Sequence, residues 1–226
     1  MRLLLVRHGQ TASNVHRLLD TAVPGADLDA VGRSQAELLV ERLAHHPIDA
    51  VYTSDLVRTQ QTVAPLAAAR GLEPRTIGGF REIQAGEDEM SPDSSRYIAV
   101  LKAWGEGDPE ASLPGGEDAE TFLERFDAGI AAVEEAGHDL PVVVSHGAAL
   151  RAWVLARAVD LDVEWAVARR MGNTAVLLCE RDAAGDWRLL DWDEGAPEIG
   201  APAEDAGPDE PVEEVPEGPD LADAER

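Results

Sequence analysis

The chain has 226 residues, and its 44 acidic residues outnumber 19 basic ones to give a formal net charge of −25. So strong a negative balance argues against nucleic acid or an anionic membrane as the main partner, because both bind basic surfaces. The single cysteine, Cys179, excludes an intrachain disulfide framework and most metal sites built from cysteines.

The first residues carry no recognisable targeting signal. Only four apolar residues, at positions 3–6, precede Arg7 and His8, whereas a signal peptide needs an apolar stretch of roughly 7–15 residues. No run along the chain approaches the roughly 18 apolar residues of a membrane-spanning helix. We therefore expect a cytoplasmic protein.

Short apolar runs alternate with amphipathic stretches along residues 1–193. The apolar runs predict buried strands, the amphipathic stretches predict helices, and Asp29 and Asp55 are the expected N-caps of the first two helices. In chain order we expect a strand at 2–6, a helix at 30–44, a strand at 49–53, helices at 56–71, 95–105 and 117–136, a strand at 142–145, a helix at 148–158 and a hairpin formed by 175–179 and 187–192. This alternation predicts an α/β fold, a three-layer α/β/α sandwich around a mostly parallel central sheet.

The acidic residues are concentrated at the C-terminal end. Residues 194–226 contain 12 acidic residues, one basic residue and six prolines, and very few large apolar side chains. Such a segment cannot bury enough apolar surface to offset the entropy lost on ordering. We expect one domain over residues 1–193 and a disordered acidic tail over 194–226, with docking of the tail to a basic partner as the alternative.

The ends of the predicted strands carry the residues that could bind a ligand or take part in catalysis. Ligands of α/β sheets gather beyond the carboxyl ends of the strands. The first strand leads into Arg7-His8-Gly9, the third leads into His146-Gly147, and Arg58 lies one turn into the helix after the second. Glycine permits close approach of the backbone to a ligand, and free N–H groups at helix starts attract anions. This pattern predicts an oxyanion pocket with a nucleophilic histidine.

Other reaction types find no support in the sequence. It contains no G-x-x-x-x-G-K-[ST] phosphate loop, no G-x-S-x-G nucleophile elbow and no H-E-x-x-H zinc motif. The Asp-x-Asp pairs do not follow an early buried strand in the way an aspartyl nucleophile with magnesium would require. We expect neither a metal nor another cofactor.

The segment from Leu5 to Thr11, with Asn14 three residues further on, resembles the signature of the histidine phosphatase superfamily. This superfamily includes the cofactor-dependent phosphoglycerate mutases and their phosphatase relatives. The resemblance continues through residues 53–62, 80–83 and 144–147, covers roughly residues 1–180, and implies a phosphoglycerate mutase-like fold.

The resemblance also implies a role for each matching residue. His8 would be the nucleophile that takes the phosphoryl group, and Glu82 would protonate the leaving oxygen and later deprotonate the attacking water. The remaining residues would surround the phosphoryl oxygens, with His146 as a third catalytic residue and three substrate-binding residues: Arg7, Asn14 and Arg58. Independently, Arg7 beside His8 should disfavour the imidazolium form and keep the ring nucleophilic. Asn14 alone could be only a residue that starts a helix.

The sequence after Glu82 favours the phosphatase branch over the mutases. Mutases usually continue with His-Tyr-Gly, whereas this chain continues with Ile83-Gln84-Ala85. We therefore expect a phosphomonoester hydrolase that acts through a phosphohistidine on a small-molecule phosphate. The alternatives are a cofactor-dependent phosphoglycerate mutase and a catalytically idle phosphate-binding or scaffold protein.

The outer wall of the pocket is expected to differ from that of relatives. A glycine common in the family is missing from residues 18–22, and residues 22–25 look inserted. Residues 83–116 would cover the pocket and carry specificity, as loops of this kind often do. The tryptophans at 153, 165, 187 and 192 are expected to pack in the core or at edges rather than to contact substrate.

Overall fold

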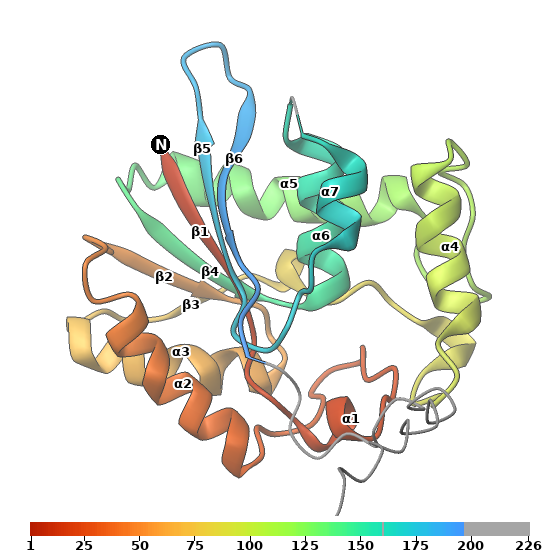
Figure 1. Ribbon diagram of the computed structural model, residues 1–226, viewed down its shortest axis with the longest axis horizontal. Coiled ribbons are helices and arrows are strands. Elements are labelled where there is room, and N and C mark those ends of the chain that lie inside the picture. The colour runs from red at the N-terminus through yellow and green to blue at the C-terminus, as the bar shows by residue number, and fades with distance from the viewer. Residues whose placement is uncertain (160, 197–226) are drawn as a thin grey trace, which may run out of the picture.

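A mixed six-stranded sheet forms the centre of the protein in the computed structural model, which describes residues 1–159 and 161–196. Its strands lie in the order β3-β2-β4-β1-β5-β6, and β1, β2, β3 and β4 are parallel, whereas β5 and β6 form an antiparallel hairpin (Figure 1). The strands are β1 Arg2–Arg7, β2 Ala50–Thr53, β3 Arg75–Thr76, β4 Pro141–Ser145, β5 Val176–Arg181 and β6 Trp187–Asp193. The mostly parallel sheet and the C-terminal hairpin confirm the prediction.

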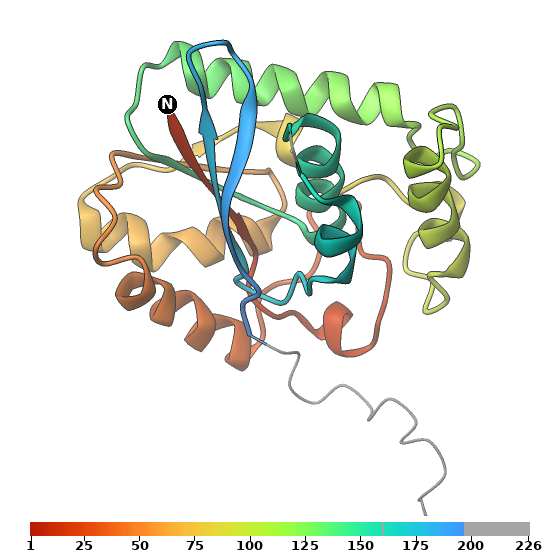
Figure 2. The same cartoon turned by 45° about the horizontal axis from the view of Figure 1, so that its top comes forward.

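Helices cover both faces of the sheet. They are α1 Ala12–Val15, α2 Ala30–Arg42, α3 Val57–Arg70, α4 Ser95–Gly105, α5 Ala119–Glu135, α6 Gly147–Arg157 and α7 Val163–Ala168, with short 3-10 helices η1 Gly78–Phe80 and η2 Gly86–Asp88. Figure 2 shows α2 and α3 on one side of the sheet and α5 and α6 on the other. The fold is therefore the predicted three-layer α/β/α sandwich.

The side chains of β1 show why the layers form. Leu3 and Leu5 belong to the apolar core on the α5–α6 side, whereas Leu4 and Val6 belong to the core on the α2–α3 side. All four are nearly inaccessible to solvent. Successive side chains of a strand point to opposite faces, so a continuously apolar strand can be covered by helices on both sides.

The two predicted N-caps have different outcomes. Asp29 caps α2 as expected, because its Oδ1 accepts a hydrogen bond of 2.7 Å from the backbone N–H of Gly32. The prediction for Asp55 is wrong: Leu56 is the N-cap of α3 and provides no side-chain hydrogen bond. The Asp55 carboxylate instead accepts a hydrogen bond of 2.6 Å from Nε of Arg81. The carboxylate therefore pairs with the charged guanidinium of Arg81 instead of the free N–H groups at the start of α3.

The first residues of the predicted tail contact the domain. The N–H of Gly172 donates to the carbonyl of Glu194 at 2.9 Å, and the N–H of Ala196 donates to the carbonyl of Asn173 at 2.8 Å. Residues 197–226 lie outside the described residues, so the disordered tail stays a prediction. Within residues 1–159 and 161–196, every helix is too short or too polar to cross a membrane.

Candidate active site

The register of β1 and β4 brings the two predicted histidines together. Arg7 lies opposite Ser145 in this parallel pair, so the next residue of each strand, His8 and His146, leaves the sheet at the same point. Both side chains are buried, and their ring centroids are 5.2 Å apart at an angle of 59°.

His8 is held as a neutral ring with one nitrogen available. Its Nδ1 lies 2.7 Å from the carbonyl oxygen of Gly9. A carbonyl oxygen can only accept, so Nδ1 carries the proton and the lone pair lies on Nε2. Burial is the main cause that holds the pKa of His8 well below 6.5, and the charges of Arg58 and then Arg7 act in the same direction. Arg7 thus acts as predicted, but burial and Arg58 contribute more.

His146 is oriented by a serine at the end of β2. Its Nε2 lies 2.8 Å from Oγ of Ser54, which in turn lies 3.0 Å from Oγ1 of Thr59. Burial, followed by the charge of Arg58, holds the pKa of His146 well below 6.5. Its Nδ1 is buried and has no hydrogen-bond partner among the residues that the structure describes. This neutral ring can therefore present its second nitrogen to a bound ligand.

Arg58 is positioned by Asp20, a residue that the sequence analysis did not select. Its Nη2 donates to the backbone carbonyl of Asp20 at 2.7 Å, and Nη1 lies 3.5 Å from that residue's carboxylate. Both side chains are at least 92% buried, at 3% and 8% exposure. Ser13 Oγ and the N–H of Ala26 also donate to the carboxylate, at 2.8 and 3.0 Å. The segment predicted to differ from relatives therefore holds Arg58, one of the predicted site residues.

Asn14 starts a helix and also lies at the cavity, so its substrate-binding role stays a prediction. It lies in the capping box that starts α1, where its Oδ1 accepts from the N–H of Thr11 at 3.1 Å. The same oxygen accepts from Nδ2 of Asn173 at 3.2 Å. Because both donors approach Oδ1, the amide nitrogen is left to donate elsewhere, and Asn14 lines the large cavity described below. Asn173 is fully buried and also donates to the carbonyl of His8.

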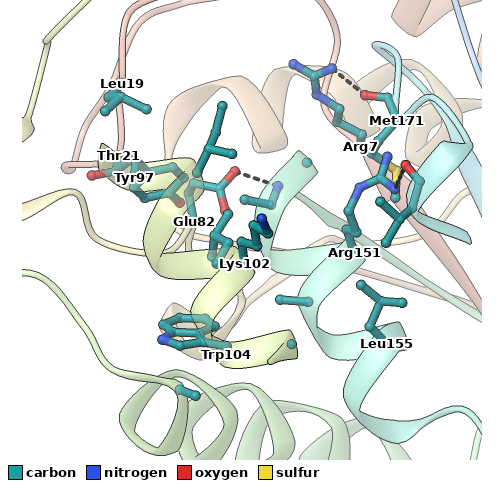
Figure 3. Close-up of a pocket in the computed structure, with 18 of the residues that line it drawn as sticks. Arg7, Leu19, Thr21, Glu82, Tyr97, Lys102, Trp104, Arg151, Leu155 and Met171 are labelled. Carbon is teal, nitrogen blue, oxygen red and sulfur yellow. Dashed lines mark hydrogen bonds between the residues drawn. The ribbon is translucent and has the colours of Figure 1, made fainter. Parts of the chain in front are cut away.

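Glu82 is fixed at the N-terminus of α6. Its carboxylate accepts hydrogen bonds from the backbone N–H groups of Ile83, Ala148 and Ala149 at 2.9, 3.1 and 2.8 Å. Figure 3 shows Glu82 and Arg7 reaching into the same cavity from different elements. Free N–H groups at a helix start favour a carboxylate, which explains why this acid, among several nearby, occupies the position.

A cavity of about 1120 Å³ joins these residues. Five of the six predicted site residues line it, and the ring of the sixth, His146, lies beside that of His8: Arg7, His8, Asn14, Arg58 and Glu82. Its far walls are formed by α4, α5, α6 and α7. The predicted covering segment therefore contributes a wall through α4, and α7 is a wall that the sequence analysis missed.

The arrangement suits transfer of an anionic group. Two guanidinium groups and an asparagine amide can bind equatorial phosphoryl oxygens, and fixed donors of this kind are the main contribution that phosphoryl transfer requires. His8 offers a nucleophile, and Glu82 offers a carboxyl group for proton transfer. Within residues 1–159 and 161–196, no group of three or more His, Cys, Asp or Glu side chains is arranged to hold a metal ion.

Known proteins share this architecture and about a third of the aligned residues. A protein of Mycobacterium tuberculosis named PE-PGRS family protein PE_PGRS11 is 33% identical over 207 residues, which are 83% of this chain but 35% of that protein. The chain thus spans about a third of that relative. The probable phosphoglycerate mutase GpmB of Yersinia enterocolitica is 32% identical over 157 residues, covering 66% of this chain and 71% of the relative.

A solved structure, described as a putative alpha-ribazole-5'-P phosphatase from Escherichia coli, superimposes with a TM-score of 0.69 at 27% identity. The match covers 88% of this chain and 98% of that one. The family model of the histidine phosphatase superfamily (branch 1) matches residues 3–195. With the six site residues arranged as described, the chain belongs to the histidine phosphatase superfamily.

Proposed function

We propose that the protein is a phosphomonoester hydrolase that acts on a small-molecule phosphate through a phosphohistidine on His8. The observation that carries the proposal is the state of His8, a buried neutral ring whose Nδ1–H donates to Gly9 and thereby places the lone pair on Nε2, while Arg7 and Arg58 lie nearby. A nucleophile beside fixed cations is what attack on a phosphoryl group requires.

In the first step, His8 Nε2 forms a bond to phosphorus as the bond from phosphorus to the ester oxygen breaks. Glu82, in its protonated form, gives its proton to the leaving oxygen, because an alkoxide is a poor leaving group. In the second step, the Glu82 carboxylate takes a proton from water, and the resulting nucleophile attacks phosphorus. The phosphorus–nitrogen bond breaks, inorganic phosphate leaves, and both residues return to their starting states.

Phosphoglycerate mutase activity is the second candidate, supported by the likeness to probable phosphoglycerate mutases at 32% identity. A mutase returns the phosphoryl group to its substrate instead of to water. The residues Ile83 and Gln84 after Glu82, in place of His-Tyr, favour hydrolysis.

Hydrolysis of 4-nitrophenyl phosphate by the wild type and by His8→Ala tests the proposal. We expect a phosphoenzyme that is labile in acid in the wild type, and loss of both label and turnover in the variant. His16→Ala is the matched control, because His16 is exposed and does not line the cavity. Turnover by His8→Ala at the wild-type rate would refute the mechanism, and an inactive wild type would favour the idle scaffold.

The mutase candidate needs a separate assay. The wild type is incubated with 3-phosphoglycerate and 2,3-bisphosphoglycerate, and isomerisation is compared with release of inorganic phosphate. We expect phosphate release to exceed isomerisation, and the reverse ratio would establish the mutase.

A further inference from the structure

The cavity is much larger than a phosphoryl group needs, and the surplus space is apolar. Pockets of roughly 300–1,000 Å³ hold drug-sized ligands, and this one reaches about 1120 Å³. Figure 3 shows Trp104 and Leu155 on the far side of the cavity from Arg7. The apolar wall, as we call this region, comprises residues of four helices, chiefly Ile98, Leu101, Trp104, Leu123, Leu155 and Val167.

Polar side chains in the cavity have little capacity left for a polar leaving group. Four donors around it point to acceptors inside the protein: Ser13 to Asp20, Thr21 to Glu89, Tyr97 to the carbonyl of Ile83, and Trp104 to the carbonyl of Ala111. Burying a sugar hydroxyl without a partner costs free energy. The cavity therefore disfavours sugar-like leaving groups.

The cations outside the phosphate site are also engaged. Among the described residues that line the cavity, these are Lys102 and Arg151. Lys102 is exposed and lies 3.5 Å from the carboxylate of Glu106. Arg151 donates to the backbone carbonyls of Ala166 and Arg169 around the end of α7. A second anionic group near α7 would have to displace the contacts of Arg151, whereas Lys102 lies at the exposed edge of the cavity.

The mouth of the cavity carries exposed apolar side chains from two helices. Ile98 of α4 is 57% exposed, and Val163 and Val167 of α7 are 56% and 58% exposed. Scattered exposed apolar residues are ordinary, but a group of them around one cavity indicates a binding surface. We propose that the substrates are monophosphate esters of large apolar alcohols, whose hydrocarbon part lies on the apolar wall. The assignment of the phosphate end rests on the proposed function.

Binding of alkylphosphonates tests the apolar wall without any turnover, because their carbon–phosphorus bond is not hydrolysed. Calorimetric titration of the wild-type protein compares ethyl-, butyl-, hexyl- and octylphosphonate. Burial of a methylene predicts about two- to fourfold tighter binding per added carbon. A dissociation constant that does not fall along the series would overturn the proposal.

Two surface substitutions locate the effect. Ile98→Asn and Val167→Asn change exposed side chains, so the fold is expected to tolerate them, and each should weaken octylphosphonate binding about three- to tenfold. Leu38→Asn is the matched control: Leu38 is 55% exposed on α2, outside the cavity, and its variant should bind as the wild type does. Equal octylphosphonate affinity in all four proteins would place the hydrocarbon elsewhere and refute the proposal.

Turnover of the matching alkyl phosphates separates the two proposals. If binding tightens along the phosphonate series but no alkyl phosphate is hydrolysed, the proposed function fails while the ligand class stands. If alkyl phosphates are hydrolysed but phosphonate binding is flat along the series, the ligand class fails while the proposed function stands.

Discussion

At His8, burial and two guanidinium groups all disfavour the imidazolium form. The same environment acts on His146, where burial again comes first. A histidine that stays neutral in the folded protein but takes up a proton in the unfolded chain lowers stability as the pH falls. The environment that keeps His8 neutral therefore costs stability in mild acid.

This linkage gives a pH-dependent prediction. Because the folded-state pKa of His8 is lowered, its contribution is fully present above the unfolded pKa of about 6.5 and is lost as the pH falls below it. The free energy of unfolding, measured with urea between pH 7.5 and 5.5, should fall less steeply in His8→Gln than in the wild type, by up to about 1.4 kcal/mol per pH unit. Identical slopes would mean that His8 binds protons equally in both states.

Asn173 is hydrogen-bonded to Asn14 and is therefore expected to orient it. Removing its amide in Asn173→Ala should free Asn14 to rotate, lower kcat about tenfold or more, and leave buried partners unsatisfied at a cost of about 1–3 kcal/mol in stability. A double-mutant cycle measures the coupling. If Asn173 works by positioning Asn14, then Asn173→Ala should reduce kcat much less in an Asn14→Ala background. Fully additive losses of kcat would contradict the positioning role.

Among the elements, α5 holds the segment that carries Glu82. Arg125 of α5 donates to the backbone carbonyls of Gly79, Arg81 and Glu82 at 2.7, 3.0 and 3.0 Å, and it forms a mostly buried pair with Glu117. This segment follows a single 3-10 turn and has no strand of its own. Arg125 thus contributes three of the hydrogen bonds that hold this segment, beside those from Ser145 to Phe80 and from Tyr97 to Ile83.

Arg125→Lys keeps the positive charge but cannot make the same planar set of hydrogen bonds. We expect a loss of about 1–3 kcal/mol in stability and a fall in kcat that exceeds any change in KM. The control is Arg157→Lys, since Arg157 pairs with a half-exposed Asp127 between α6 and α5. Such a pair contributes about 0–1 kcal/mol. Equal effects of the two substitutions on kcat would exclude a special role for Arg125.

The elements that the sequence predicts well are those with a long or continuous apolar pattern. The helix expected at 30–44 is α2, Ala30–Arg42, and the helix expected at 117–136 is α5, Ala119–Glu135. The missed elements include β3 with two residues, both exposed, α1 with four and α7 with six, all too short to show a period. Local patterns carry no information about elements that exist only because of their neighbours.

The same distinction applies to the site. His8, Arg7 and Asn14 lie in one local motif, so they could be predicted together. Asp20 and Asn173 could not, because their contacts with Arg58 and Asn14 span 38 and 159 residues of sequence. Nothing in the sequence around Trp104 distinguishes it from the other tryptophans. It reaches the cavity because α4 is placed there by the fold.

For the whole molecule, the net charge of −25 conceals two different regions. Residues 194–226 hold 12 of the acidic residues and one basic residue, whereas Arg7 and Arg58 lie inside the cavity. An anionic ligand that has entered the cavity can therefore contact Arg7 and Arg58 despite the acidic total. Before entry, the ligand is repelled by the negative net charge of the molecule. Salt at 0.1–0.15 M screens this repulsion beyond a Debye length of about 8–10 Å.

The boundary between these regions gives the last prediction. A chain ended after Asp193 loses the backbone hydrogen bonds of Glu194 and Ala196 with Gly172 and Asn173, whereas a chain ended after Ala196 keeps them. Because Asn173 orients Asn14, we expect the shorter chain to have a lower Tm and a lower kcat. The longer one should match the full chain in both at 150 mM salt. If both shortened chains match the full chain in Tm and kcat, residues 194–196 do not support the site. If both shortened chains have a lower Tm and kcat than the full chain, the boundary lies after Ala196.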